Sequence, residues 1–358
     1  MSDLASYQVQ DDSANGLIER LDPALDELVP SPSSVEKICE GFAWSEGPVW
    51  KDGALFFSDV PANILYRWTP GSGHAEVFLE PSGGILANPD FVEPGSNGLA
   101  LDSEGRLLLC QHGARRVARL EDDGRTQTVL ADRFEGRRLN NPNDLVFHSS
   151  GAVYFTDPSY GFRGRDVSPL KEIPWNGVYR IAPDRTVALL TKDLPFPNGL
   201  AFSPDKKTLY VAVSDAALPR IVAFDVQSDG LLGASRLFFD AVALLKRGLS
   251  GTCDGLKVDV HGNIFATVPG GVAVLSPEGK HLGTILIGVT SNCCWGDDGA
   301  TLYITADDRV CRIRTTTQGT PFRGFSKTRP LPHFSGGCTT TTTSIVPADS
   351  PASDSSVD

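Results

Sequence analysis

The sequence predicts an all-β fold, a six-bladed β-propeller built from four-stranded antiparallel blades. The first observation is a motif of five residues that recurs six times and opens with an acid or an asparagine. The copies begin at Glu46, Asn97, Asn143, Asn198, Asp254 and Asn292. Their first residues lie 38 to 56 positions apart, and repeats of about 40 to 55 residues made of short strands are typical of propellers.

The second observation is that each motif is followed by further strand-like runs of apolar, β-branched and aromatic residues. The second run of each unit covers 54–59, 106–111, 152–157, 208–213, 263–268 and 301–306. A third run covers 64–68, 116–120, 177–181, 221–225, 271–275 and 310–314, and a fourth, in five units, 76–79, 128–131, 186–190, 236–239 and 283–287. Gly, Asp and Pro punctuate these runs, so they predict antiparallel strands joined by turns.

The third observation concerns the ends of the repeat. The sixth unit has no fourth run, but an unassigned strand, Val35 to Cys39, precedes the first unit. This strand is predicted to complete the last blade and close the ring, which removes exposed sheet edges.

These patterns divide the chain into three predicted parts. Residues 1–30 form an N-terminal extension with one short helix expected over Leu17 to Leu28, and 31–325 form the propeller catalytic domain. Residues 326–358 form a C-terminal segment, whose tail from about residue 339 is rich in Thr, Ser, Pro and Ala. Such a tail cannot bury enough apolar surface to order itself.

Composition narrows the class of protein. The chain has 358 residues, is 41% hydrophobic and carries a formal net charge of −12. An acidic balance argues against nucleic-acid and anionic-membrane partners, and no apolar stretch approaches the roughly 20 residues of a membrane helix. The start lacks a secretory pattern, and the seven cysteines show no paired spacing. A cytoplasmic protein with reduced thiols, monomeric or weakly dimeric, is expected.

The first residues of the motifs suggest a cation site. The innermost strand of each blade borders the central channel, so residues that open these strands converge. Glu46, Asn143, Asn198 and Asp254 would supply two carboxylates and two amide oxygens, the ligands that Ca²⁺ and Mg²⁺ prefer. Asn97 and Asn292 would form a second tier. Asn-Gly and Asp-Gly pairs also form tight turns, but that role does not explain Glu46 before Gly-Pro.

Five segments carry a resemblance to a known family. They are Ser45–Trp50, Arg138–Leu145, Tyr154–Gly161, Pro197–Pro204 and Asp254–Asp259. With their order and spacing, over roughly residues 40 to 315, the chain resembles the gluconolactonase, regucalcin and senescence-marker-protein family. The resemblance implies a six-bladed propeller that hydrolyses lactones or related esters with a divalent metal in its channel.

The resemblance also implies roles for individual residues. Glu46, Asn198 and Asp254 match the family's metal ligands, Asn143 matches an asparagine that joins the metal or contacts substrate, and Asp254 is the usual base or nucleophile. One divalent ion is expected, Ca²⁺ first, with Mg²⁺, Mn²⁺ or Zn²⁺ as alternatives. Asn141 stands where some sugar lactonases have a substrate-binding arginine, which argues against a gluconolactone-like substrate.

A mechanism follows from the residue chemistry. A metal-polarised lactone carbonyl would be attacked by water, with Asp254 as general base. His112, at the end of a second strand, is the other predicted catalytic residue and would position substrate or shuttle a proton.

Substrate-binding residues are predicted at the mouth of the channel and in one long loop. Asn97 and Asn143 open inner strands, while Tyr160 and Trp175 belong to the loop 158–175. Aromatic and Arg residues in this loop suggest a lid for a substrate larger or more apolar than a simple aldonolactone.

Two other functions stay open. The first is a biosynthetic propeller, a cyclase or condensing catalyst like strictosidine synthase, because a fold does not settle a function. The enlarged aromatic loop is compatible with it, whereas the set of four oxygen ligands favours hydrolysis. The second is a non-catalytic calcium-binding propeller, in which Asp254 and His112 would have no role.

Overall fold

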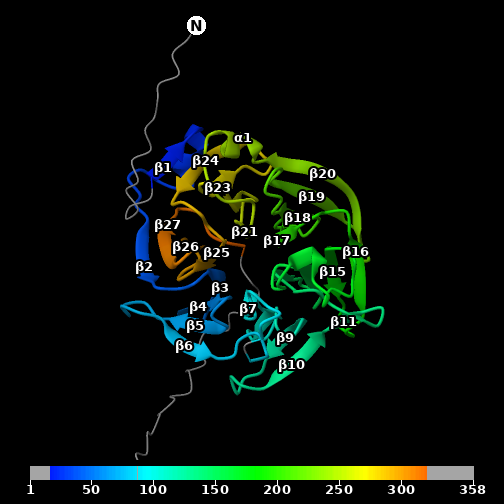
Figure 1. Cartoon of the computed structure of the whole chain (residues 1–358). Helices are drawn as coiled ribbons and strands as arrows, with labels where there is room; N and C mark the ends of the chain where they lie inside the picture. Colours follow the sequence, from blue (N-terminus) through cyan, green and yellow to red (C-terminus); the bar gives the residue numbers. More distant parts are fainter. Residues whose placement is uncertain (1–16, 87, 321–358) are drawn as a thin grey trace, which may run out of the picture. The chain divides into compact units, whose positions relative to one another are not determined.

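The computed structural model describes residues 17–86 and 88–320 and confirms a six-bladed β-propeller of antiparallel sheets (Figure 1). Blade 1 contains β3 (Ser45–Lys51), β4 (Ala54–Asp59), β5 (Ile64–Trp68) and β6 (Glu76–Leu79). Blade 2 contains β7 (Ser96–Leu101), β8 (Leu107–Gln111), β9 (Arg116–Leu120) and β10 (Gln127–Ala131). Blade 3 contains β13 (Leu145–Phe147), β14 (Val153–Asp157), β15 (Gly177–Ile181) and β16 (Val187–Thr191).

The other blades follow the same order of strands. Blade 4 contains β17 (Pro197–Phe202), β18 (Thr208–Val213), β19 (Arg220–Val226) and β20 (Leu232–Asp240). Blade 5 contains β21 (Leu256–Val258), β22 (Ile264–Val268), β23 (Gly271–Leu275) and β24 (His281–Leu286). Blade 6 contains β25 (Asn292–Gly296), β26 (Thr301–Ala306) and β27 (Arg309–Arg314). Shorter elements join them: the hairpin β11 (Arg133–Phe134) and β12 (Arg137–Arg138), the 3₁₀ helix η2 (Arg165–Val167) and α1 (Val242–Lys246).

Closure of the ring by an N-terminal strand is confirmed. β2 (Glu36–Glu40) pairs with β27 as the fourth strand of blade 6, and Lys37 lies opposite Cys311. The inner strands β3, β7, β13, β17, β21 and β25 contact one another in this order, and β25 contacts β3. The first and last blades are therefore joined in two ways. Their inner strands β25 and β3 are in contact, and the chain passes directly from β2 in blade 6 to β3 in blade 1.

The expected helix over Leu17 to Leu28 is wrong. β1 (Leu17–Arg20) pairs antiparallel with β24 as a fifth strand of blade 5, and Leu17 lies opposite Leu286. A 3₁₀ helix, η1 (Pro23–Glu27), follows; Asp22 caps it and Pro23 begins it. The open edge of β24 offers backbone partners that four isolated residues could not find in a helix. The predicted segment 326–358 lies outside the described residues.

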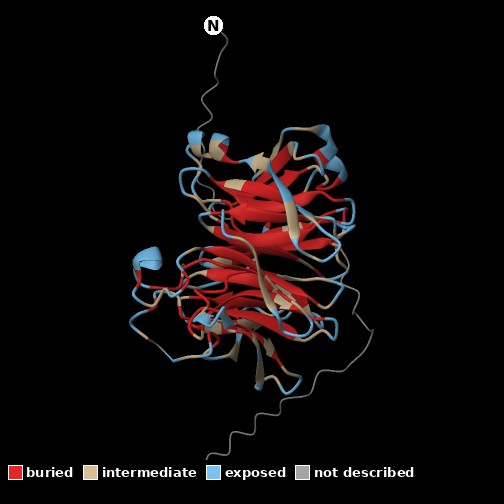
Figure 2. Ribbon diagram, turned by 90° about the vertical axis from the view of Figure 1, so that its right-hand side faces the viewer, coloured by how far each residue is buried: buried red, intermediate tan, exposed pale blue. Residues whose placement is uncertain are grey.

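The hydrophobic core lies between neighbouring blades. The strands are buried along most of their length, and exposed residues gather in the connecting loops (Figure 2). One cluster, between blades 2 and 3, contains the fully buried Leu108, Cys110, Phe155 and Tyr179. Because apolar side chains fill the gaps between sheets, the inner strands are held in fixed positions relative to one another. No described helix is long and apolar enough to cross a membrane.

Glycines allow the inner strands to approach one another closely. A Cβ atom on Gly199 would lie 2.4 Å from the carbonyl oxygen of Asp254 in the next blade, and one on Gly47 would lie 2.1 Å from that of Asn97. Gly98 and Gly255 have similar clashes with blades 3 and 6. The second residue of these four motifs is therefore glycine because the backbone of the next blade, or for Gly255 the Asn292 side chain, occupies the space of a side chain. Asn97-Gly98 and Asn198-Gly199 lie within strands rather than in turns.

Candidate functional site

The asparagines that open three inner strands form a buried chain across blades 2 to 4. The Asn97 amide nitrogen donates to Asn143 Oδ1 at 2.9 Å, and the Asn143 amide nitrogen donates to Asn198 Oδ1 at 2.6 Å. Asn198 in turn donates to Ser214 Oγ at 2.9 Å. The structure thus brings together three of the residues predicted from the repeat.

Asp254 is buried next to this chain of amides. Burial raises the pKa of its carboxyl group well above the ordinary value, and the charges of Glu46 and Asp144 raise it further, while Asn198 opposes the shift. Its Oδ1 atom is buried and has no hydrogen-bond partner within the described residues. Asp254 and Glu46 therefore lie close enough to influence one another's charge, as the repeat predicted.

Glu46 is the second predicted carboxylate, and it is 2% exposed. Its Oε2 atom accepts hydrogen bonds from the Gly47 backbone at 2.6 Å and from the Asn292 amide at 3.3 Å. Burial, and then the charge of Asp144, raise the pKa of Glu46 to about 8. In the ion-free protein, burial therefore favours the protonated form of this carboxyl group.

The sequence analysis missed Asp144, a third carboxylate in contact with this group. Asp144 occupies the position of the third motif that is glycine in four others. Its Oδ1 accepts from the Leu145 backbone at 2.8 Å and its Oδ2 from the Asn292 amide at 3.2 Å. Burial raises its pKa, and the nearby ammonium of Lys257 opposes this effect.

Lys257 was also missed. It stands at the fourth position of the fifth motif, where the other copies have Val, Ala or Trp. Its ammonium donates to Asn292 Oδ1 at 3.2 Å. A charged residue in place of an apolar one on an inner strand was the available signal.

His112 is fully buried beside the amides. Its Nδ1 lies 3.2 Å from the backbone oxygen of Glu93, and because a carbonyl only accepts, Nδ1 carries the proton. Its Nε2 is buried without a partner in the described structure. Burial lowers the pKa of His112 to about 4, so the imidazole is neutral at pH 7 and Nε2 is an acceptor. Glu93, a further residue that the sequence did not single out, has its pKa raised by burial to about 7.

Tyr160 faces the same group of residues, whereas Trp175 has other contacts. The Tyr160 hydroxyl is buried near Ser214 and Asn198 but forms no hydrogen bond of good geometry with a described residue. Burial raises its pKa, and the neighbouring Ser214 side chain opposes this effect. Its ring stacks on Phe196, with centroids 6.1 Å apart. Trp175 instead donates to the Tyr179 hydroxyl at 2.9 Å, and Lys192 lies over its ring.

The loop 158–175 is held by backbone contacts to the segment before β7. The Arg163 N–H donates to the Asp90 oxygen at 2.8 Å, and the Val92 N–H donates to the Gly161 oxygen at 2.9 Å. Phe91 and Phe162 form an isolated β-bridge. This loop is therefore anchored on the connection between blades 1 and 2, which places Tyr160 in a defined position.

The residues present fit a divalent cation. Burial raises the pKa values of Glu46, Asp144 and Asp254, repulsion between the carboxylates adds to the shift for Glu46 and Asp254, and the Lys257 ammonium offsets it only in part. Asp254 Oδ1 also lacks a partner. A doubly charged ion would compensate both deficits. In residues 17–86 and 88–320 no three His, Cys, Asp or Glu side chains are grouped as a metal site. The predicted set differs from such a group because two of its four members are asparagines.

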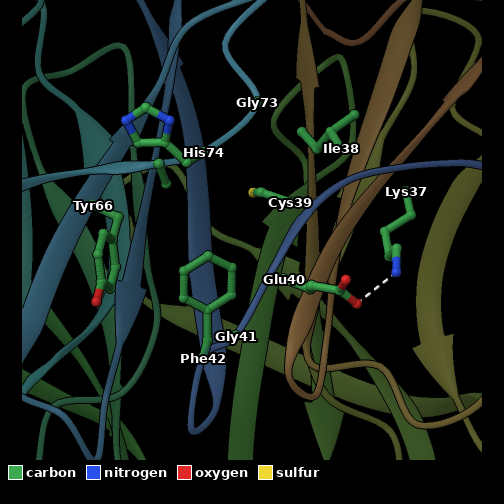
Figure 3. A pocket seen from close by; sticks show the side chains of 10 residues that line it. Lys37, Ile38, Cys39, Glu40, Gly41, Phe42, Tyr66, Gly73 and His74 are labelled. Atoms are coloured by element: carbon green, nitrogen blue, oxygen red, sulfur yellow. Dashed lines mark hydrogen bonds and ion pairs between the residues drawn. The ribbon is translucent and has the colours of Figure 1, made fainter.

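A separate cavity of about 360 Å³ lies between the closing strand β2 and the outer strands of blade 1. Phe42 and Tyr66 line it, and Lys37 and Glu40 form an ion pair at its side (Figure 3). None of the predicted site residues borders it. It is therefore a surface feature at the closure of the ring, distinct from the group at the inner strands.

Fold and site together define a six-bladed propeller with a buried oxygen-donor group where its inner strands begin. Residues 44–308 match the model of the SMP-30/Gluconolactonase/LRE-like region, and the chain belongs to this family. It is 42% identical to the gluconolactonase of Zymomonas mobilis over 321 residues, which cover 86% of this chain and 88% of that protein.

Two more distant relatives are also named as a lactonase and a gluconolactonase. The chain is 28% identical over 245 residues to lactonase drp35 of Staphylococcus aureus, covering 66% of this chain and 67% of that protein. The solved structure of a gluconolactonase from Xanthomonas campestris superimposes with a TM-score of 0.71 at 30% identity, covering 83% of this chain and 94% of that chain.

Proposed function

We propose that this protein is a metal-dependent lactone hydrolase. The observation that carries the proposal is the buried Asp254 carboxyl group, which has an unpartnered oxygen and a strongly raised pKa beside Glu46. Pairs of titratable groups perturbed in this way are typical of catalytic sites. Relatives named gluconolactonase and lactonase supply the reaction class.

Four side chains would hold the ion: Glu46, Asn143, Asn198 and Asp254. Their oxygens suit Ca²⁺ first, with Mg²⁺, Mn²⁺ or Zn²⁺ as alternatives. When bound, the ion would polarise the lactone carbonyl and stabilise the charge that develops on its oxygen. It would also favour the ionised form of Asp254, which burial alone disfavours at neutral pH.

Asp254 is the proposed general base. The Asp254 carboxylate accepts a proton from the attacking water as the new C–O bond forms, and returns it to the ring oxygen as the ester bond breaks. The proton is thereby conserved within one turnover. Water enters the acyl product, and the ring oxygen leaves as a hydroxyl group.

The substrate is expected to be a hydroxylated lactone. His112 Nε2, Asn97 Oδ1 and the Tyr160 hydroxyl are buried without a hydrogen-bond partner in the described structure. Buried polar atoms are normally hydrogen-bonded, and the hydroxyl groups of a substrate, or ordered water in its absence, would supply these partners. Asn143 would contact substrate or the ion. The contacts of Trp175 with Tyr179 and Lys192 favour a packing role. Glucono-δ-lactone is the first substrate to test because a relative is named gluconolactonase, and its hydrolysis would overturn the expectation against such a substrate that rests on Asn141. Cytoplasmic location and a monomer or weak dimer stay predictions.

Removal of divalent ions is expected to abolish lactone hydrolysis. Chelator-treated, dialysed protein should lose at least 99% of its activity on glucono-δ-lactone, since losing the Lewis acid removes several kcal/mol of transition-state stabilisation. Added Ca²⁺, Mg²⁺, Mn²⁺ or Zn²⁺, titrated separately, should restore it. The measurement is proton release at constant pH, with the ion content verified by elemental analysis. Full turnover by verified ion-free protein would exclude the proposal.

Ion binding is expected to strengthen as pH rises toward 8. The pKa of Glu46 is raised by burial to about 8, so an ion must displace its proton at lower pH. In the ion-free protein, the folded state holds this proton between the ordinary pKa of 4.5 and the raised folded value, so stability falls as pH rises through this window. Calorimetric titrations at pH 6.5, 7.5 and 8.5 test this; an affinity that does not change with pH would contradict it.

A further inference from the structure

We propose that Asn292 is a positioning residue that presents Glu46 to the ion through a single carboxylate oxygen. The inference rests on the proposed function, because it takes Glu46 as a metal ligand. Asn292 opens β25 in blade 6, and its side chain reaches carboxylates that belong to blades 1 and 3. It thus links three inner strands through one amide group.

Two donors determine how the Asn292 amide is oriented. The Cys293 backbone N–H lies 2.9 Å from one amide atom, and the Lys257 ammonium lies 3.2 Å from the same atom. Both groups can only donate, so this atom is Oδ1. The Nδ2 group consequently faces the carboxylates, where it can donate its two hydrogens.

Steric contact fixes the position of the amide as well. Asn292 is 1% exposed, and a Cβ atom on Gly255 would lie 2.0 Å from its Cγ. The absence of a side chain at residue 255 is what makes room for the amide. Rotation of the Asn292 side chain would break four buried hydrogen bonds, so the amide is held in one orientation.

The two carboxylates that accept from Asn292 differ in how many of their oxygens are hydrogen-bonded. Asp144 has both oxygens engaged, Oδ1 by the Leu145 backbone and Oδ2 by Asn292. Both hydrogen bonds to Glu46 fall on Oε2, from Gly47 and Asn292. Oε1 of Glu46 is left for a ligand, and Asp144 is a structural acceptor rather than a further metal ligand.

Replacing Asn292 is expected to lower the affinity of the protein for the ion without unfolding the protein. Outer partners of metal ligands typically contribute 10- to 100-fold to metal affinity. Asn292→Leu keeps the branched shape of the side chain but removes both N–H donors, so the dissociation constant for Ca²⁺ should rise at least tenfold in calorimetric titration of the purified full chain. Asn292→Ala, which adds no bulk, should do the same and guards against a folding defect of the leucine variant.

A matched control separates positioning from stability. Asn263 is also a buried asparagine that donates to a carboxylate, Asp259 Oδ2 at 2.8 Å, but it has no contact with Glu46. Asn263→Leu should lower the melting temperature and leave the Ca²⁺ dissociation constant within threefold of wild type. If both Asn292 variants bind Ca²⁺ as the wild type does, while Glu46→Gln does not bind it, the inference fails and the metal site stands. If the wild type binds none of the four candidate ions, the metal site fails and the inference falls with it.

Discussion

Asp254→Asn should reduce kcat for lactone hydrolysis by at least 100-fold at saturating ion while leaving the fold intact. General-base catalysis contributes typically 10²- to 10⁴-fold, and an amide cannot take the proton of the attacking water. The fold should persist because burial opposes the charge of this carboxylate, so a neutral group of the same shape removes an unfavourable term. The loss should therefore appear in kcat, measured at several ion concentrations, and not in the melting temperature.

An exposed aspartate provides the control for Asp254→Asn. Asp225 lies on β19 and forms a 3.5 Å ion pair with Arg236, in which both side chains are more than half exposed. Asp225→Asn carries the same change of charge and should leave kcat unchanged, since exposed ion pairs contribute little. Retention of wild-type kcat by Asp254→Asn, with the ion shown to be bound, would remove Asp254 from the role of base.

The fold could be predicted from the sequence because the same motif recurs six times and the copies support one another. One copy such as Asn97-Gly98 reads equally well as a turn, but six copies at similar intervals, each followed by alternating runs, have a propeller as their common explanation. The closing strand was predictable for a related reason. A missing strand in the sixth unit and a surplus one before the first are complementary, and a closed ring satisfies both.

The pairing of β1 with blade 5 could not be predicted in this way. Leu17–Arg20 is a short segment without a repeated pattern, and its partner, β24, lies far along the chain. Local propensity therefore suggested a helix. The open backbone edge of β24, which exists only in the folded sheet, determined the outcome.

The site was predictable where it depended on the repeat and was missed where it depended on departures from it. The first residues of the motifs lie together as expected. Asp144 stands where four other motifs have glycine, and Lys257 stands where the other motifs have an apolar residue. A search for what the six copies share does not single out these two exceptions, although both belong to the site. Glu93 lies outside the motifs, and only the folded segment before β7 places it against His112.

Gly199→Ala should destabilise the protein by about 3 kcal/mol and impair catalysis, the largest structural effect expected of a single added methyl group. Its Cβ would lie 2.4 Å from the Asp254 carbonyl oxygen and 2.6 Å from the Gly255 Cα, so the backbone of one inner strand must move. Forcing extra methyl groups into packed regions costs typically 1–3 kcal/mol, and rigid backbone atoms put this site at the upper end. Because the displaced residue is Asp254, kcat should fall together with the melting temperature.

Gly73→Ala separates this steric effect from the general consequences of replacing glycine. Gly73 is exposed, and an added Cβ there meets no atom within 4 Å. Alanine should be tolerated at this position, with kcat and the melting temperature near the wild-type values. If Gly199→Ala behaved like Gly73→Ala, the inner strands would be looser than their contacts indicate, and the positions of Asn198, Asp254 and Asn292 would no longer follow from strand packing. A melting curve and a single rate measurement on each variant decide between these outcomes.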